Sequence, residues 1–130
     1  MVALQASAVW VTAPPDACGE GGAEARVLGG RTLGARSFVN VEAAARTLEG
    51  GCGGQRLDLT LGHRPAEHWL GMAQVFVDAP IDGRETIQGQ VSLVAFGAND
   101  RGIQIGIRAR LDGEDAEPAL VIGFWRRPLD

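Results

Sequence analysis

Apolar and polar residues alternate without interruption in Ile103-Gln104-Ile105-Gly106-Ile107-Arg108-Ala109-Arg110-Leu111. A period of two places the apolar side chains on one face of a β-strand and the polar side chains on the other. Turn-forming residues flank the stretch, with Asn99-Asp100-Arg101-Gly102 before it and Asp112-Gly113 after it. The stretch therefore predicts a strand with one apolar face, entered and left through short turns.

The same alternation recurs elsewhere in the chain. Leu57, Leu59 and Leu61 alternate with charged and polar residues, and the sequence from Ile87 to Ala95 repeats the pattern. Further strands are expected at residues 2–12, 69–77 and 119–126. The connections after residue 55 are short, which requires antiparallel pairing, because a parallel crossover needs about a dozen residues or more.

One helix is expected over residues 38–49. Apolar residues recur there at the spacing of a single helical stripe: Phe38, Val41, Ala44, Ala45 and Leu48. Ser37 or Asn40 is available as an N-cap, Glu42 suits the positive end of the helix dipole, and Gly50-Gly51 ends the helix. The preceding segment, residues 14–36, is rich in Pro and Gly and predicts an irregular loop, with a substrate lid as the alternative.

The composition describes one globular domain covering residues 1–130. Hydrophobic residues make up 45% of the chain and charged residues 22%, so disorder of the whole chain is excluded. A net charge of −4 argues against a nucleic-acid partner. No apolar run reaches the ~20 residues of a membrane-spanning helix, and no membrane partner is expected. All twelve basic residues are Arg, which we interpret as the codon bias of a GC-rich, bacterial genome.

The N-terminal stretch and the cysteines favour the cytoplasm. No Lys or Arg precedes the apolar residues at the start of the chain, so a secretory signal is not expected. The two cysteines, Cys18 and Cys52, form neither a disulfide framework nor a Cys-x-x-Cys motif. We therefore expect free thiols and a cytoplasmic protein, although a single bridge between the two is geometrically open.

The expected fold is α+β, with an antiparallel sheet of five to six strands over residues 55–127 and the N-terminal strand wrapped around the helix. A small closed antiparallel β-barrel is the alternative fold. A domain of this size leaves a wide apolar sheet uncovered, and this predicts a homodimer. Trp10, Trp69 and Trp125 lie in predicted strands and either fill the core or line an apolar cavity.

A resemblance to the hotdog fold is carried by the passage Val75-Phe76-Val77-Asp78-Ala79-Pro80-Ile81-Asp82-Gly83-Arg84-Glu85-Thr86-Ile87. This passage is similar to the strand–turn–strand segment of acyl-thioester hotdog proteins, the thioesterases and MaoC-like hydratases. The similarity continues through a long strand and an Asn-Asp-x-Gly turn to the closing Gly123-Phe124-Trp125-Arg126-Arg127-Pro128. It implies a protein that binds an acyl thioester of coenzyme A or an acyl carrier protein, as a thioesterase or hydratase without a cofactor.

The resemblance also implies candidate catalytic residues. Where the family carries its signature before the helix, this chain has Phe38-Val39-Asn40-Val41-Glu42. Asn40 would polarise the thioester carbonyl and Glu42 would activate water, with a helix cap and a dipole partner as their structural alternatives. His68 is a third candidate, as a general base, although His63-Arg64-Pro65 and His68 also suit a surface turn. No metal site is expected, because a catalytic metal usually takes three protein ligands.

Arginines near the C-terminus predict an anion-binding patch. Arg108 and Arg110 share the polar face of one predicted strand, and Arg126 and Arg127 lie on the strand expected to pair with it. Arginine binds phosphate in bidentate fashion, so the patch suits coenzyme A or a carrier protein; protection of a sheet edge is the alternative. Two other function classes stay open: a non-catalytic ligand- or partner-binding module, and a small β-barrel cyclase acting on a polyketide-like substrate.

Overall fold

Eight β-strands follow one another both along the chain and across a single sheet in the computed structural model of the protein. The strands are β1 (Val2–Trp10), β2 (Gly21–Leu33), β3 (Ser37–Leu48), β4 (Gly53–Ala66), β5 (Trp69–Pro80), β6 (Thr86–Phe96), β7 (Arg101–Arg110) and β8 (Ala119–Arg126). A 3-10 turn, η1 (Glu49–Gly51), joins β3 to β4. The structure describes residues 2–10, 19, 21–81, 83–99, 101–113 and 118–126, with the backbone alone for residues 3–10.

Every neighbouring pair of strands is antiparallel, as the short connections predict. The strands expected after residue 55 are confirmed, and so is a strand near the N-terminus. The α+β hotdog-like fold is wrong, because the described residues contain no α-helix for a sheet to wrap. The closed form is not observed either: within the described residues the hydrogen-bonded order runs from β1 to β8 without a pairing between these two.

Residues 38–49, expected as a helix, form β3 and η1 instead. The same residues also show a period of two, because Val39, Val41, Ala43 and Ala45 occupy one face of β3. Phe38, Ala44 and Leu48, which belong to the expected helical stripe, lie on the other face with Asn40, Glu42 and Arg46. Pairing with β2 on one side and β4 on the other satisfies the backbone of every residue in this stretch. Tertiary pairing therefore overrides the local helical pattern.

The predicted loop at residues 14–36 is wrong for residues 21–33, which form the 13 residues of β2, whereas residues 34–36 form the turn between β2 and β3. Residues 14–18 lie outside the part of the chain that the structure describes. The glycines of this segment lower its strand propensity, but β1 and β3 pair with it on both sides and compensate for that cost.

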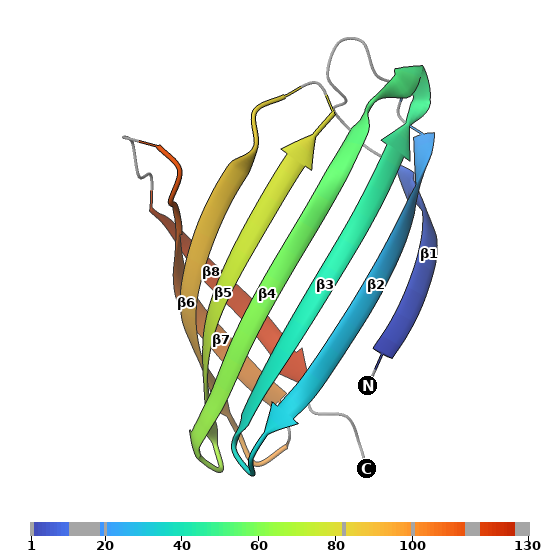
Figure 1. Cartoon of the computed structure of the whole chain (residues 1–130). Coiled ribbons are helices and arrows are strands. Elements are labelled where there is room, and N and C mark those ends of the chain that lie inside the picture. Colours follow the sequence, from blue (N-terminus) through green and yellow to red (C-terminus); the bar gives the residue numbers. More distant parts are fainter. Residues whose placement is uncertain are drawn as a thin grey trace.

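The sheet is strongly curved, with β7 and β8 lying behind the strands from β2 to β5 (Figure 1). At one end, which we call the turn end, β2–β3, β4–β5 and β6–β7 are joined by two to four residues, and both termini of the described chain lie there (Figure 1). The opposite loop end carries the connections β1–β2, β3–β4, β5–β6 and β7–β8, of four to ten residues. No helix in the described part of the chain is long and apolar enough to cross a membrane.

A small apolar cluster fills the concave side near the turn end. It consists of Leu70, Met72, Val94 and Phe96, with Phe38 packed against it. Glycines make room for the rings, because a Cβ on Gly62 would overlap Phe38 and a Cβ on Gly102 would crowd Phe96. Together with Ala44, the four buried members of this cluster are the only buried hydrophobic side chains among the residues described, and Leu70 and Val94 are the most completely buried.

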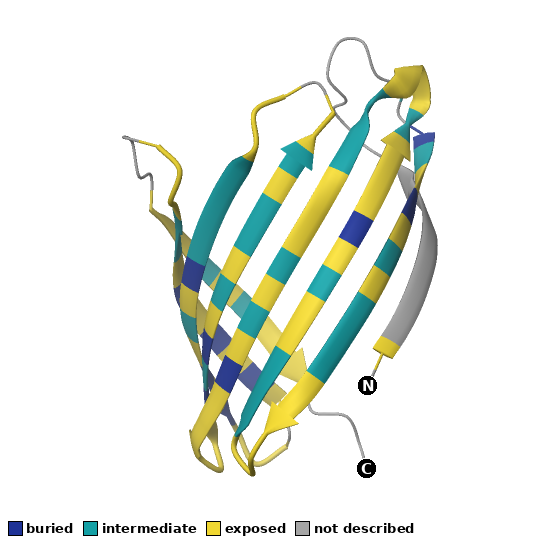
Figure 2. Ribbon diagram, in the orientation of Figure 1, coloured by how far each residue is buried: buried dark blue, intermediate teal, exposed yellow. Residues whose placement is uncertain are grey.

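The exposed area is large for a chain of this size. The solvent-accessible surface is 9223 Å², whereas a compact monomer of 13.6 kDa is expected to expose roughly 6,600 Å². Burial alternates along the strands from β2 to β8, so that one face of the sheet is more covered than the other (Figure 2). Most of the hydrophobic residues of the chain therefore lie on the outside of the sheet rather than in a core.

Candidate functional site

The convex face of the sheet is a continuous apolar surface. We define it by the alternate strand positions that point away from the cluster around Leu70. Between residues 23–29, 39–45, 57–61, 71–79, 87–95, 103–109 and 120–124, every such position is Gly, Ala, Val, Leu, Ile or Phe. Their large side chains are exposed in Val27, Val41, Leu57, Leu59, Leu61, Val75, Val91, Leu93, Ile103, Ile105, Ile107, Leu120, Ile122 and Phe124.

Charged and aromatic residues border this convex face at the turn end. Arg101 and Arg126 occupy the last outward positions of their strands, Arg31 lies one outward position before the end of β2, and His63 and Trp69 lie at the same border. Trp69, Ala95, Ile103 and Phe124 form one row across β5–β8 by cross-strand pairing. The surface is thus an aliphatic band edged by aromatic and basic side chains.

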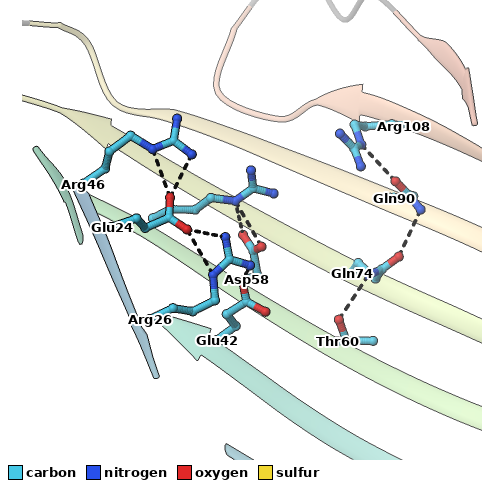
Figure 3. A network of polar contacts seen from close by, with 10 residues as sticks. Glu24, Arg26, Glu42, Arg46, Asp58, Thr60, Gln74, Gln90 and Arg108 are labelled. Atoms are coloured by element: carbon cyan, nitrogen blue, oxygen red, sulfur yellow. Dashed lines mark hydrogen bonds and ion pairs between the residues drawn. The ribbon is translucent and has the colours of Figure 1, made fainter. Parts of the chain in front are cut away.

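The concave face is polar beyond the apolar cluster, and its charges are paired (Figure 3). Glu24 on β2 is 7% exposed and accepts hydrogen bonds from two arginines. Arg46 Nε and Nη2 donate to its Oε2 at 2.9 and 2.8 Å, and Arg26 Nη2 donates to its Oε1 at 2.6 Å. Arg26 also bridges to Glu42, and Arg56 Nε donates to Asp58 Oδ1 at 2.8 Å. The network therefore holds three carboxylates and three guanidinium groups on β2, β3 and β4.

A ladder of neutral groups continues the network across the sheet (Figure 3). Gln74 Nε2 donates to Thr60 Oγ1 at 3.1 Å, and Gln90 Nε2 donates to Gln74 Oε1 at 3.0 Å. Arg108 Nε donates to Gln90 Oε1 at 2.9 Å, and its guanidinium lies 4.4 Å from the centre of the Phe76 ring. These contacts link β4, β5, β6 and β7, so the concave side chains are held in fixed positions by one another.

The hydrogen bonds that Glu24 accepts from Arg26 and Arg46 lower the pKa of this carboxyl below its ordinary value of 4.5. The same contact with Glu24 raises the pKa of Arg26. Both shifts favour the charged forms, the carboxylate of Glu24 and the protonated guanidinium of Arg26. The arrangement suits a rigid, permanently charged lining rather than a group that exchanges protons near neutrality.

The predicted catalytic residues do not form a site. Asn40 and Glu42 lie on the concave face of β3, opposite Thr60 and Asp58 of β4. Glu42 is engaged by Arg26. His68 lies in the turn between β4 and β5, beyond the end of β3, because Ser37 at the start of β3 already pairs with His63. The register therefore separates His68 from the other two candidates.

The predicted arginine patch does not form either, because its members lie at opposite ends of the sheet. Arg108 pairs in register with Ala119, whereas Arg126 pairs with Arg101 at the turn end. Arg110 lies at the loop end and donates to Asp112 at 2.9 Å. Arg127 lies outside the described residues. No group of metal-ligating side chains is present within the described part of the chain.

The remaining sequence candidates divide between the two faces. Trp69 is 44% exposed on the convex face, whereas Trp125 points to the concave side and its indole Nε1 donates to Gln104 at 2.7 Å. The side chain of Trp10 is not among those described. Cys52, at the loop end, takes part in a disulfide bond, so the expectation of free thiols is wrong for this residue. Cys18 lies outside the described residues.

Sequence reasoning missed the paired charges of the concave face. The signal was present as alternation within strands, in Ala23-Glu24-Ala25-Arg26-Val27 and in Arg56-Leu57-Asp58-Leu59. Which charges meet across strands depends on register, and register could not be derived while β2 and β3 were not recognised as strands. Comparison with protein-family models, with curated proteins and with solved structures finds no match.

Proposed function

We propose that this protein is a non-catalytic, lipid-embedded module, whose convex face contacts the acyl chains of a bilayer. The observation that carries the proposal is the convex face itself, an uncharged aliphatic band that crosses seven strands. Soluble monomers rarely expose contiguous apolar patches larger than a few hundred Å². A sheet with an apolar outer face and a polar inner face is the arrangement that membrane-spanning strands use.

The dimensions support the same proposal. A strand needs about 9–11 residues to cross a bilayer at the usual tilt, and the strands here are 8–14 residues long. The short connections at one end, the longer ones at the other and the even number of strands are also typical of membrane-spanning sheets.

The paired charges of the concave face fit this environment. The side chains of the concave face contact one another across neighbouring strands and face away from the apolar band. Glu24, Arg26 and Arg46 satisfy one another, so burial of Glu24 on the concave face leaves its charge paired. The disulfide of Cys52 at the loop end supports a location outside the reducing cytoplasm.

A second copy of the chain is the alternative cover for the convex face. A standard interface buries about 800 Å² on each partner and is roughly flat. The apolar band instead follows the curvature of the sheet from β2 to β8, so one partner molecule would leave most of it exposed. A fluid hydrocarbon phase covers the whole band, and we therefore favour lipid.

The acyl-thioester function stays an untested prediction. The fold from which it was carried over is absent, and Asn40, Glu42 and His68 are not brought together. For these reasons the geometry favours the lipid-contacting module.

The test uses the tryptophans on opposite faces of the sheet. The protein is refolded with vesicles whose lipids are brominated near the carbonyl end of the acyl chains, the depth expected for Trp69 at the border of the apolar band. Bromine quenches indole fluorescence on contact. One variant keeps Trp69 alone (Trp10→Phe and Trp125→Phe) and the other keeps Trp125 alone (Trp10→Phe and Trp69→Phe). We expect strong quenching of Trp69, on the convex face, and weak quenching of Trp125, which is hydrogen-bonded to Gln104 on the concave side.

Two outcomes would overturn the proposal. Equal, weak quenching of both tryptophans, with the protein recovered from the aqueous phase as a monomer, would show a water-exposed convex face. Recovery of a discrete soluble dimer whose Trp69 is shielded from aqueous quenchers would assign the convex face to a second copy.

A further inference from the structure

We infer that the turn end of β7 and β8 binds the headgroup phosphate of an anionic phospholipid, through Arg101 and Arg126. This inference rests on the proposed function, because it places a lipid headgroup next to the band that would contact acyl chains. The two arginines are directly opposite each other in the β7–β8 register and both are exposed.

Like charges directly opposite one another destabilise an antiparallel pair. The described chain keeps this pair at the edge of its apolar band, while the arginines of the concave network each contact a carboxylate or an amide oxygen. An anion between the two guanidinium groups would remove the repulsion and give each of them a charge-assisted hydrogen bond. The cross-strand arginine pair therefore points to an anionic partner rather than to a structural role.

The surroundings define the rest of the partner. A hollow of about 680 Å³ lies at this position, lined by Arg101, Arg126, Asn99, Ala95, Ile103 and Phe124. Its lining is cationic and polar on one side and apolar on the other, and Phe124 is the most exposed large apolar residue of the described chain, at 85%. A free phosphate ion would use only the arginines. A phospholipid would place its phosphate on the arginines and the start of an acyl chain against Ile103 and Phe124.

The position relative to the bilayer is consistent with a headgroup. The outward residues next to the arginines, Ile103 and Phe124, belong to the apolar band and to the same row as Trp69. Aromatic rings at such a border lie at the level of the headgroups. The arginines therefore lie one position beyond the hydrocarbon, which is the depth of the phosphates.

The test compares insertion into zwitterionic phosphatidylcholine vesicles with insertion into vesicles containing phosphatidylglycerol. The variant is Arg101→Gln/Arg126→Gln, and the matched control is Arg36→Gln/Arg84→Gln, in which two exposed arginines outside the hollow are changed. Anionic lipid attracts roughly 1 kcal/mol per arginine, which corresponds to about fivefold per residue and about 25-fold for the pair. We expect the variant to lose a preference of this size for anionic vesicles, and the control to lose clearly less.

The outcomes separate this inference from the proposed function. If neither the natural protein nor the variants insert into phosphatidylcholine, the proposed function fails. If all of them insert and the arginine-pair variant keeps its preference for anionic vesicles, the headgroup site alone is overturned. Inorganic phosphate at millimolar concentration is added as a competitor. If phosphate abolishes the preference of the natural protein for anionic vesicles, the hollow binds a free anion, and the inference is overturned.

Discussion

Leu59 on the convex face and Leu70 on the concave face lie on neighbouring strands of one sheet, yet Leu59 is 44% exposed and Leu70 is 2% exposed. The same contrast holds for the charges, since Glu24 is buried on the concave side while the convex band contains no charged residue between its borders. In a soluble sheet the polar face would be the open one. This inversion is the reason for proposing that an apolar phase covers the convex face.

The largest expected effect is the difference in the free energy of unfolding between alanine variants of Leu70 and Leu59. Leu70→Ala opens a cavity in the cluster with Val94 and Phe96, and we expect the free energy of unfolding in vesicles to fall by about 2–5 kcal/mol. Leu59→Ala removes the same atoms from a site facing lipid, and we expect a loss of about 1 kcal/mol or less. Denaturant titration of both variants in vesicles measures the difference. Equal losses would mean that Leu59 packs against protein, such as a second copy.

The next largest effect is expected from an arginine introduced at one of two depths in the bilayer, the middle of the apolar band or a position beyond its end. Ile105 lies in the middle of β7 and Ile81 follows β5 at the loop end, and their exposed fractions are close, at 58% and 61%. We expect Ile105→Arg to cost about 2–4 kcal/mol of stability in a bilayer and Ile81→Arg about 0–1 kcal/mol, because the cost depends on depth. The measurement is the folded fraction in vesicles over a series of urea concentrations. Two equally mild variants would indicate that water covers both positions.

The paired charges of the concave face predict a smaller, pH-dependent effect. Glu24→Gln leaves Arg46 without its carboxylate, and we expect a loss of about 1–2 kcal/mol at pH 7, a value reduced for the partial exposure of the arginines. Because the pKa of Glu24 is lowered in the folded state, its stabilisation is present above the ordinary value of 4.5 and disappears as the pH falls through the folded-state pKa.

Unfolding of the natural protein and of Glu24→Gln should therefore differ at pH 7 and converge at strongly acidic pH. Glu49→Gln, which changes an exposed carboxyl at the loop end, is the control and should follow the natural protein throughout. A difference between Glu24→Gln and the natural protein that stays constant down to acidic pH would show that the carboxylate charge is not the source of the stabilisation.

The strands after residue 55 were predictable from sequence because Leu57–Leu61 and Ile103–Leu111 alternate cleanly, and a period of two has a single structural interpretation. Residues 38–49 were not, because the alanines at 43–45, which follow Val39 and Val41, fit a helix and a strand equally well. The expected helix at residues 38–49 was also the basis for predicting a sheet wrapped around a helix, which is the hotdog-like fold. The alternating leucines and isoleucines face either a core or the outside, depending on the direction in which the sheet curves. The sequence of a single strand does not determine that direction.

The candidate site followed the same division. The charges Glu24, Arg26, Arg56 and Asp58 were visible in the sequence, but the contacts between β2 and β3 depend on register. The pairing of Arg101 with Arg126 is a further case, because Arg126 was expected to join Arg108 and the register places it near the opposite end of β7. Long-range pairing therefore determined every part of the site that sequence reasoning missed.

The smallest expected effect concerns the other carboxylate held by an arginine. Arg110 lowers the pKa of Asp112 much as Arg26 and Arg46 lower that of Glu24, but Asp112 lies at the loop end in open solvent. Water competes for the same hydrogen bonds there and salt screens the attraction, so we expect Asp112→Asn to leave the unfolding midpoint unchanged at both low and high salt. The comparison with Glu24→Gln is made by the same denaturant titration at pH 7. A destabilisation of Asp112→Asn equal to that of Glu24→Gln would mean that the curved sheet provides no shielding, and that the concave face is as wet as the loop end.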